Sequence, residues 1–141
     1  MLDLFAGSGA LGVEALSRGA ASVTFVDSDS SALAAIKANL AVVGDLQARA
    51  SVIRREALQY CASAPEVDVV LADPPYQFAS WSPLLSLLVA RTHTLVAETG
   101  SEWNPGPEWE TVVVKKYGGT VVTVARPDPR RAAVLRLEGE M

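Results

Sequence analysis

The chain has 141 residues, which is enough for one domain and too few for two. Half of the residues are hydrophobic and 20% are charged, which is ordinary for a globular protein. The net charge of −4 argues against a domain that binds nucleic acid mainly through positive charge.

The first predicted elements are a short strand, a glycine-rich turn and a helix. Residues 1–5 are mostly apolar, and Gly7, Gly9 and Gly12 follow them with the G-x-G-x-x-G spacing. Glycines let the backbone turn tightly and approach a ligand, and the third one permits close contact between helix and strand. We therefore predict a strand, a ligand-binding turn and a helix that runs to about Ser17.

A second strand over residues 23–26 leads to an acidic residue. Asp27 follows Gly7 by 20 residues, the distance at which an acid after the second strand reaches a ribose diol. A carboxylate there can accept from both hydroxyls, and such charge-assisted bonds are worth ~1.5–3 kcal/mol. In the alternative interpretation, Asp27 is an N-cap or turn residue before the next helix, over residues 31–42. The glycines and Asp27 together indicate a nucleoside cofactor.

The third strand, residues 50–53, also leads to an acidic residue, Glu56. At this strand end an acid would meet the amino group of an adenine. The sequence supports equally well that Glu56 begins a short helix over residues 56–62. Within this helix, Tyr60 and Cys61 are interpreted as packing residues. Because Cys61 is the only cysteine, an internal disulfide framework is excluded and a reducing cytoplasm is expected.

The fourth strand ends in a turn that two prolines make stiff. Residues 67–71 are almost wholly apolar and β-branched, as in a strand buried on both faces. Pro74 and Pro75 have no N–H and stop the sheet ladder. The carboxylate of Asp73, the carbonyl of Pro74 and the ring of Tyr76 are then left where ligands bind in open α/β sheets. Two acceptors beside a ring suit a planar base with an exocyclic amine; the alternative is a plain loop turn.

An apolar helix is predicted over residues 81–90 and a fifth strand over residues 94–98. The apolar run within this helix, residues 84–90, is broken by Ser86 and is too short to span a bilayer, so no membrane partner is expected. His93 is the only histidine, and the sequence offers no nucleophile or metal-ligand cluster for it to serve. It is interpreted as structural, and no metal site is predicted.

The C-terminal part is predicted to form a loop, a hairpin and a tail. Residues 99–109 contain two prolines and two glycines and are expected to be a loop. Residues 110–116 and 120–125 are β-branched strands joined by a tight turn. Residues 127–141 form a tail in which residues 132–137 are a candidate edge strand. The arginines of this region are a basic stripe in one interpretation and part of a solvated tail in the other: Arg126, Arg130, Arg131 and Arg136.

These elements predict an α/β fold, with a mostly parallel sheet flanked by helices and a C-terminal antiparallel hairpin. Four segments carry a resemblance to a known family: DLFAGSG at residues 3–9, FVD at 25–27, DPPY at 73–76 and KYGGT at 116–120. Together they resemble the bacterial 16S ribosomal RNA guanine-N2 methyltransferases, over residues 1 to about 126. The resemblance implies a Rossmann-like class I methyltransferase fold and a domain over residues 1–126.

The resemblance further implies that S-adenosylmethionine is the cofactor and that the N2 amine of a guanine in 16S rRNA is methylated. The expected setting is a partly assembled small ribosomal subunit in the cytoplasm. By similarity, Asp73 and the Pro74 carbonyl would accept hydrogen bonds from the target amine, and Tyr76 would stack on the flipped base. At position 56 the family more often has Asp, which departs from Glu56. The residues expected to contact the cofactor are Asp3, Phe5, Ala6, Gly7, Ser8, Gly9, Asp27, Ser28, Glu56, Ala57 and Asp73.

Two features depart from the family. Its members have some tens of residues before the first strand, including a helix near the cofactor, whereas this sequence begins inside that strand. We therefore expect a fragment or a shortened form, with a more open cofactor site and weakened activity. The second departure is the acidic net charge, because rRNA affinity comes largely from Lys and Arg contacts to phosphate.

Three alternative functions stay open at this point. The first is an amino-methyltransferase that acts on DNA or on another RNA. The second is a truncated form that binds the nucleoside cofactor with little activity. The third is an NAD-dependent dehydrogenase, which shares the glycine turn and Asp27 but gives residues 73–76 no role. The target guanine and the oligomeric state are left open by the sequence.

Overall fold

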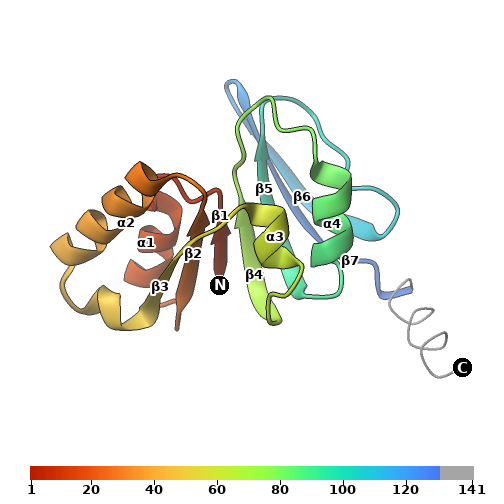
Figure 1. The fold of residues 1–141 in the computed structure, drawn as a ribbon. Helices are drawn as coiled ribbons and strands as arrows, with labels where there is room; N and C mark the ends of the chain where they lie inside the picture. Colours follow the sequence, from red (N-terminus) through yellow and green to blue (C-terminus); the bar gives the residue numbers. More distant parts are fainter. Residues whose placement is uncertain (131–141) are drawn as a thin grey trace, which may run out of the picture.

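The computed structural model describes residues 1–130, and Figure 1 shows helices on both faces of one sheet. Residues 131–141 lie outside the described residues, and with them Arg131, Arg136 and the candidate edge strand over residues 132–137. The strands of the described part are β1 (Leu2–Leu4), β2 (Val23–Asp27), β3 (Ala50–Arg54), β4 (Val67–Ala72), β5 (Thr92–Thr99), β6 (Trp109–Tyr117) and β7 (Thr120–Pro127).

The four α-helices form where the sequence predicts them, and two of them begin at a side-chain cap. Asp29 caps α2, because its carboxylate accepts the N–H of Ser31 at 3.0 Å. Glu56 caps α3 in the same way. Between α2 and β3 the chain makes a short 3₁₀ helix that the sequence analysis did not predict. The helices are α1 (Ala10–Ser17), α2 (Ser30–Val42), the 3₁₀ helix η1 (Gly44–Arg49), α3 (Ala57–Cys61) and α4 (Trp81–Leu88).

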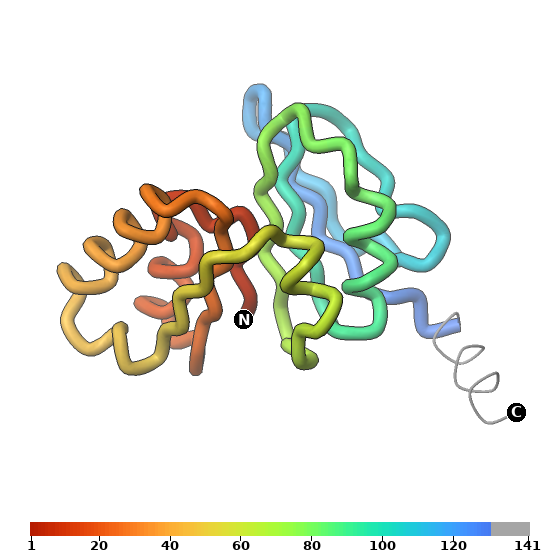
Figure 2. Tube along the Cα trace, viewed as in Figure 1, coloured from red at the N-terminus to blue at the C-terminus, as the bar shows by residue number. Residues whose placement is uncertain are grey.

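The strand order places a topological switch at the middle of the sheet. The order is β3-β2-β1-β4-β5-β7-β6. The first five strands are parallel, whereas β7 runs antiparallel to β5 and to β6. Figure 2 shows the chain leaving β3 and crossing to α3 and β4 on the other half of the molecule. The strand order therefore reverses between β1 and β4, which is where open α/β sheets bind their ligands.

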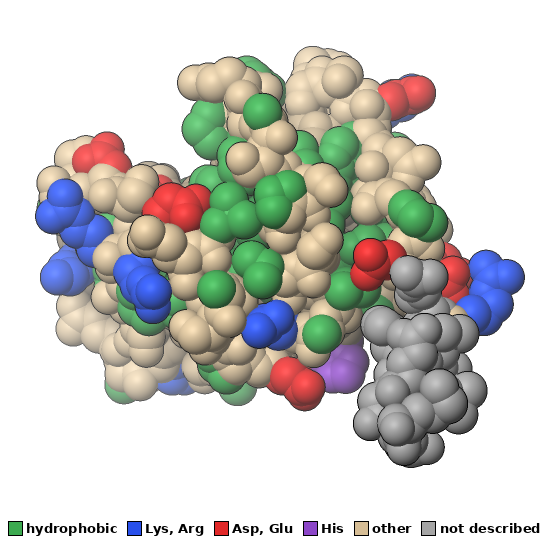
Figure 3. Space-filling model, turned by 45° about the vertical axis from the view of Figure 1, so that its right-hand side comes forward, with side chains coloured by type: hydrophobic (Ala, Val, Ile, Leu, Met, Phe, Trp, Pro, Cys, Tyr) green, Lys and Arg blue, Asp and Glu red, His purple; other side chains and the backbone are tan. Residues whose placement is uncertain are grey.

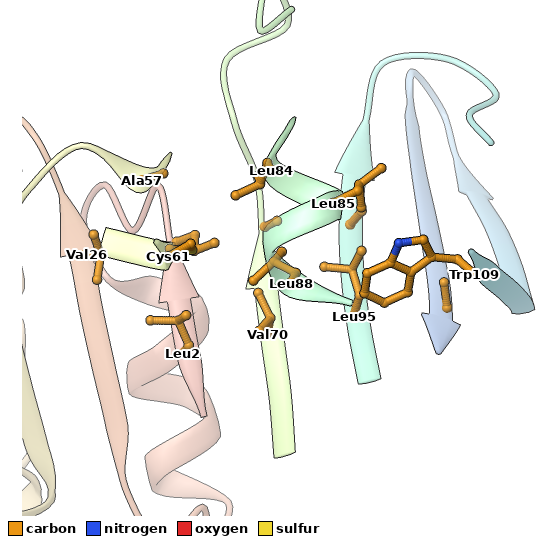
Figure 4. Packing of buried hydrophobic residues seen from close by; sticks show 14 residues of the cluster. Leu2, Val26, Ala57, Cys61, Val70, Leu84, Leu85, Leu88, Leu95 and Trp109 are labelled. Atoms are coloured by element: carbon orange, nitrogen blue, oxygen red, sulfur yellow. The ribbon is translucent and has the colours of Figure 1, made fainter. Parts of the chain in front are cut away.

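Two hydrophobic cores lie on opposite faces of the sheet, because neighbouring strand residues point to opposite sides. Phe25 packs with Leu16, Ile36 and Leu40 of α1 and α2, whereas the adjacent Val26 belongs to the other core. Figure 4 shows this second core between α3, α4 and the sheet. Its labelled members are Leu2, Val26, Ala57, Cys61, Val70, Leu84, Leu85, Leu88, Leu95 and Trp109.

Cys61 is fully buried in the second core, as its interpretation as a packing residue requires. Burial raises the pKa of its thiol to about 11, so the thiol stays protonated and unreactive near neutral pH. None of the helices within residues 1–130 is long and apolar enough to cross a membrane.

The predicted α/β fold is confirmed, and the position of one residue differs from the sequence analysis. His93 was placed between helix and strand but lies within β5, where its side chain is exposed. The predicted C-terminal hairpin is present; its second strand, β7, lies between β5 and β6, so the edge strand is β6, an order on which the sequence analysis made no prediction. Strand order depends on contacts between distant segments, which local sequence patterns do not encode.

Candidate active site

A cavity of about 620 Å³ lies at the carboxyl ends of β1, β2 and β4. It therefore opens at the topological switch of the sheet. The segments that reach it are the glycine turn after β1, the end of β2 and the proline turn after β4. Its lining residues are Asp3, Phe5, Ala6, Gly7, Ser8, Ala10, Leu11, Asp27, Ser28, Asp73, Pro74, Pro75 and Tyr76.

The glycine turn is held in a conformation that most residues avoid. Phe5, Gly7 and Gly9 have φ angles of 56°, 57° and 80°. For Phe5, which has a Cβ atom, this left-handed region costs roughly 1–2 kcal/mol. The turn is fixed by the N–H of Gly9, which donates to the carbonyl of Ala6 at 2.8 Å. The N–H of Ala6 in turn donates to β2. The backbone beside the cavity is therefore already shaped before a ligand binds.

Gly12 allows α1 to lie directly against the sheet. A Cβ atom at this position would stand 2.3 Å from Cε1 of Phe25 and 2.9 Å from Oδ2 of Asp3. These distances are too short for any side chain, so the third glycine serves the close helix–strand contact that its spacing predicted. Gly9 lies beneath the turn, where a Cβ atom would stand 3.0 Å from Ile36. Gly9 is therefore the one predicted turn residue that does not line the cavity.

Asp3 is a buried carboxyl group at the floor of the cavity, with 2% of its surface exposed. Burial raises its pKa from 3.8 to about 7, and the nearby charges of Asp73 and Asp27 add to the rise. The N–H of Gly12, which donates to Oδ2 of Asp3 at 3.2 Å, opposes it. A cationic ligand in the cavity would favour the ionised form of this group.

Asp27 fastens the glycine turn to the end of β2. Its Oδ2 accepts the N–H of Gly7 at 2.9 Å, and its Oδ1 accepts the N–H of Asp29 at 2.9 Å. The sequence analysis gave an N-cap or a turn residue as the alternative to a ribose contact for Asp27. The N-cap is wrong, because Asp29 caps α2. The turn role is present, and Asp27 lines the cavity as well. Each carboxylate oxygen keeps a second lone pair, so the backbone bonds leave room for a ligand hydroxyl.

Glu56 has the helix-starting role that the sequence left open, whereas its contact with an adenine stays a prediction. Its carboxylate accepts the N–H groups of Leu58 and Gln59 at 3.1 and 3.0 Å, so it caps α3. It also borders a recess of about 60 Å³ beside the main cavity. Ala57 lines the same recess, and the recess shares Phe5, Asp27 and Ser28 with the main cavity. The full lining of the recess is Phe5, Val26, Asp27, Ser28, Arg55, Glu56 and Ala57.

The proline turn faces the same cavity from the other side. Asp73, Pro74, Pro75 and Tyr76 all line it. Tyr76 is 82% exposed, and its ring lies along Gly100, where an added Cβ atom would stand 2.9 Å from Cδ1 of Tyr76. The ring therefore leans against the loop after β5 and keeps most of its surface free for another planar group.

The sequence analysis missed Glu98, whose carboxyl group lies beside that of Asp73, so that the two acidic groups influence each other's pKa. In the parallel pair of β4 and β5, Ala72 is opposite Ala97, so the residues that follow lie side by side. An acidic residue at the end of a strand was the available signal, but its neighbour could be identified only from the strand order. Leu11 of α1 was also missed; it lines the cavity and is 41% exposed.

A chain of aromatic rings leads away from the cavity, and the sequence analysis did not predict it. The ring centroids of Phe5 and Phe78 are 5.0 Å apart, those of Phe78 and Trp81 are 5.3 Å apart, and those of Trp81 and Trp103 are 4.6 Å apart. Trp81, Trp103 and Tyr76 border a hollow of about 130 Å³ next to the cavity, and Glu98 is in its lining. Two of these rings, Trp81 and Trp103, therefore face the proline turn across this hollow.

Figure 3 shows one face of the molecule, on which the basic side chains are scattered among acidic and apolar ones. They do not gather into one patch on this face. Among residues 1–130, no group of three or more His, Cys, Asp and Glu side chains is arranged to hold a metal ion.

Comparison with known proteins identifies relatives over most of the described chain. The model of the family described as conserved hypothetical protein 95 matches residues 1–126. The ribosomal RNA small subunit methyltransferase D of Haemophilus influenzae is 41% identical over 90 residues, which are 62% of this chain and 47% of that protein. The chain thus spans about half the length of this curated relative.

Solved structures share the fold over nearly the same region. A conserved hypothetical protein of Streptococcus pyogenes has a TM-score of 0.80 and 29% identity, covering 90% of this chain and 84% of that one. A structure from Haemophilus influenzae has a TM-score of 0.76 and 32% identity, covering 89% of this chain and 84% of that one.

Proposed function

We propose a function from the premise that this chain belongs to the family described as conserved hypothetical protein 95. It is an S-adenosylmethionine-dependent methyltransferase that methylates the exocyclic N2 amine of a guanine in 16S ribosomal RNA. Residues 1–126 are its methyltransferase domain. The name of the Haemophilus influenzae relative, a small-subunit rRNA methyltransferase, supports the substrate class. The observation that carries the proposal is that Asp73, Pro74 and Tyr76 face the same cavity as the glycine turn and Asp27.

The residues of the cavity fit S-adenosylmethionine. A volume of about 620 Å³ lies within the usual range for small-molecule sites. Three carboxyl groups line it, those of Asp3, Asp27 and Asp73, and they suit a ligand that carries a sulfonium and an ammonium group. The raised pKa of Asp3 marks a buried carboxyl group that a cation would stabilise in its ionised form.

The cofactor would be held by the N-terminal half of the cavity. Asp3 and the glycine turn, from Phe5 to Gly9, bind its methionine part. Asp27, with Ser28 beside it, accepts hydrogen bonds from the ribose hydroxyls. Glu56 and Ala57 border the adenine in the adjacent recess. When bound, S-adenosylmethionine supplies the electrophilic methyl group.

The target base would be held by the proline turn. A guanine 2-amino lone pair is delocalised into the ring, so this nitrogen is a poor nucleophile. Asp73 and the Pro74 carbonyl would each accept a hydrogen bond from one N–H group of this amine. These two bonds would polarise the nitrogen and orient its lone pair toward the methyl group. Flipping the base costs a few kcal/mol of lost stacking, and the exposed ring of Tyr76 returns part of this.

The proposed substrate is a partly assembled small ribosomal subunit, and we place the reaction in the cytoplasm, where such subunits form. Methyl transfer from radiolabelled S-adenosylmethionine to stripped 16S rRNA, to small subunits and to DNA tests the proposal. We expect label in rRNA, and N2-methylguanine as the product after digestion. Label in DNA alone would favour the alternative amino-methyltransferase. Cofactor binding without label in any substrate would favour a truncated binding form.

A further inference from the structure

The side chains of Asp73 and Glu98 form a carboxyl pair that the roles proposed above leave unexplained. The register of β4 and β5 places the two residues side by side at the edge of the cavity, where their carboxyl groups are close enough to share a hydrogen bond. An ionised carboxyl group can only accept hydrogen bonds. One of the two must therefore carry a proton for this bond to exist.

Charge and burial place that proton on Glu98. Burial raises the pKa of both groups. The hydrogen bond from Glu98 opposes the rise for Asp73, whereas the charge on Asp73 and the shared bond raise the pKa of Glu98 further. Asp73 is thus the ionised partner, which lines the cavity. Glu98 is the protonated partner and borders the side hollow behind Pro74, Pro75 and Tyr76.

The charged groups around Asp73 and Glu98 do not offset the repulsion between two ionised carboxylates, so a shared proton is what relieves it. Asp3 on β1 and Asp27 on β2 are also acidic, and the charges of Asp73 and Asp27 raise the pKa of Asp3. Lys116 of β6 pairs with Glu102, which lines the same hollow as Glu98. Among the ion pairs of residues 1–130, none includes Asp73 or Glu98.

We propose that Glu98 is the positioning residue for Asp73: its carboxyl group donates a hydrogen bond that fixes the Asp73 carboxylate toward the target amine. The inference rests on the proposed function. In the transfer, the N–C bond forms as the methyl–sulfur bond breaks, and the electron pair of that bond stays on sulfur. The nitrogen then loses a proton to Asp73, after which both carboxyl groups of the pair are protonated. The pair returns this proton to solvent when the product leaves.

Kinetics of Glu98 variants test the positioning role. Glu98→Ala should lower kcat by about tenfold or more, because a charge-assisted hydrogen bond is lost, while the Kd for S-adenosylmethionine stays within about twofold. Glu98→Gln should restore kcat to within about threefold of wild type, because an amide still donates to Asp73. Glu102→Gln is the matched control, a nearby carboxylate that pairs with Lys116, and should leave both constants unchanged. Equal kcat loss in the Ala and Gln variants would overturn the proposal.

A pH profile adds a readout that a purely structural side chain would not change. The wild-type profile of kcat should contain two protonation steps that belong to the pair, and the Glu98→Gln profile only one. Two unchanged steps in that variant would contradict the shared proton.

Carbon-13 NMR titration of the side-chain carboxyls tests the pair without any activity. In the free protein, Asp73→Asn should lower the pKa of Glu98 toward its ordinary value of 4.5, because the negative neighbour is gone. Independent titration of the two groups at ordinary values would overturn the pair even if methyl transfer is observed. Coupled titration without transfer to any guanine would instead overturn the proposed function and leave the pair standing.

Discussion

The two sides of the cavity hold their carboxylates by different means. On the side of β1 and β2, Asp3 and Asp27 accept hydrogen bonds from backbone N–H groups of the glycine turn, of α1 and of Asp29. On the side of β4 and β5, Asp73 lies beside another carboxyl group, and Tyr76 is 82% exposed. The side of β1 and β2, which would hold the cofactor under the proposed function, is therefore fixed by the fold itself. The side of β4 and β5, which would hold the target base, depends on side chains and is free to adjust to a substrate.

The largest expected effect on stability comes from a methyl group added on the side of β1 and β2. Gly12→Ala would place a Cβ atom 2.3 Å from the ring of Phe25, which is fully buried and cannot move aside. We expect a loss of about 3 kcal/mol in the free energy of unfolding, measured by urea denaturation. Gly119→Ala is the control, because nothing lies within 4 Å of that position and the change should be neutral. A stable Gly12→Ala variant would show that the contact of α1 with the sheet is loose.

Asp3→Asn, also on the side of β1 and β2, should raise the stability of the protein while it weakens cofactor binding. The pKa of Asp3 is about 7 in the folded protein and 3.8 ordinarily, so its contribution to stability is full below pH 3.8 and is lost as the pH rises through 7. The amide keeps the acceptor for Gly12 and carries no charge. We expect the variant to be about 2 kcal/mol more stable than wild type above the folded pKa, and to bind the cofactor more weakly. Thermal melts from pH 3.8 to above 7 measure the difference in stability between the two proteins. If the stability of both proteins changes with pH in the same way, the prediction is refuted.

Asp27→Ala should weaken cofactor binding by at least about tenfold, on the order of 1.4 kcal/mol. It removes the ribose acceptor together with the bonds to Gly7 and Asp29. Asp29→Ala is the matched control: it removes the cap of α2 and should cost about 1 kcal/mol of stability without changing the Kd. Calorimetric titration with S-adenosylmethionine measures both variants. An unchanged Kd for Asp27→Ala would remove this residue from the binding site.

The smallest effect on stability is expected from a methyl group added on the side of β4 and β5. Gly100→Ala would place a Cβ atom 2.9 Å from the ring of Tyr76, but that ring is exposed and can swing away. We expect a change in unfolding free energy within about 0.5 kcal/mol. The KM for rRNA should rise severalfold while the cofactor Kd stays the same. A destabilisation as large as that of Gly12→Ala would erase the difference between the two sides.

The sequence predicted which residues line the cavity more completely on the side of β1 and β2 than on the side of β4 and β5, for a physical reason. Glycine spacing, the strand after it and Asp27 are close in sequence, and the contacts among them are set by local geometry. The proline turn is also local, and its residues were predicted to form one site. The partner of Asp73 is not local, because Glu98 reaches it only through the pairing of β4 with β5.

The same limit applies to the strand order of the fold. The type and position of nearly every element followed from periodicity and turn residues. The insertion of β7 between β5 and β6 did not, since no local pattern distinguishes it from an edge strand. The backbone bonds of Asp27 were likewise hidden, because they depend on how the glycine turn folds back over β2.

The central claim is that the proline turn presents Asp73 to a target amine across a cavity whose other side binds the methyl donor. One experiment tests it most directly: Asp73→Ala, measured for methyl transfer to rRNA and for S-adenosylmethionine affinity in the same preparation. The account predicts transfer reduced by at least about 100-fold, with the Kd for the cofactor within a few fold of wild type. Unchanged transfer, or an equal loss of transfer and affinity, would contradict it.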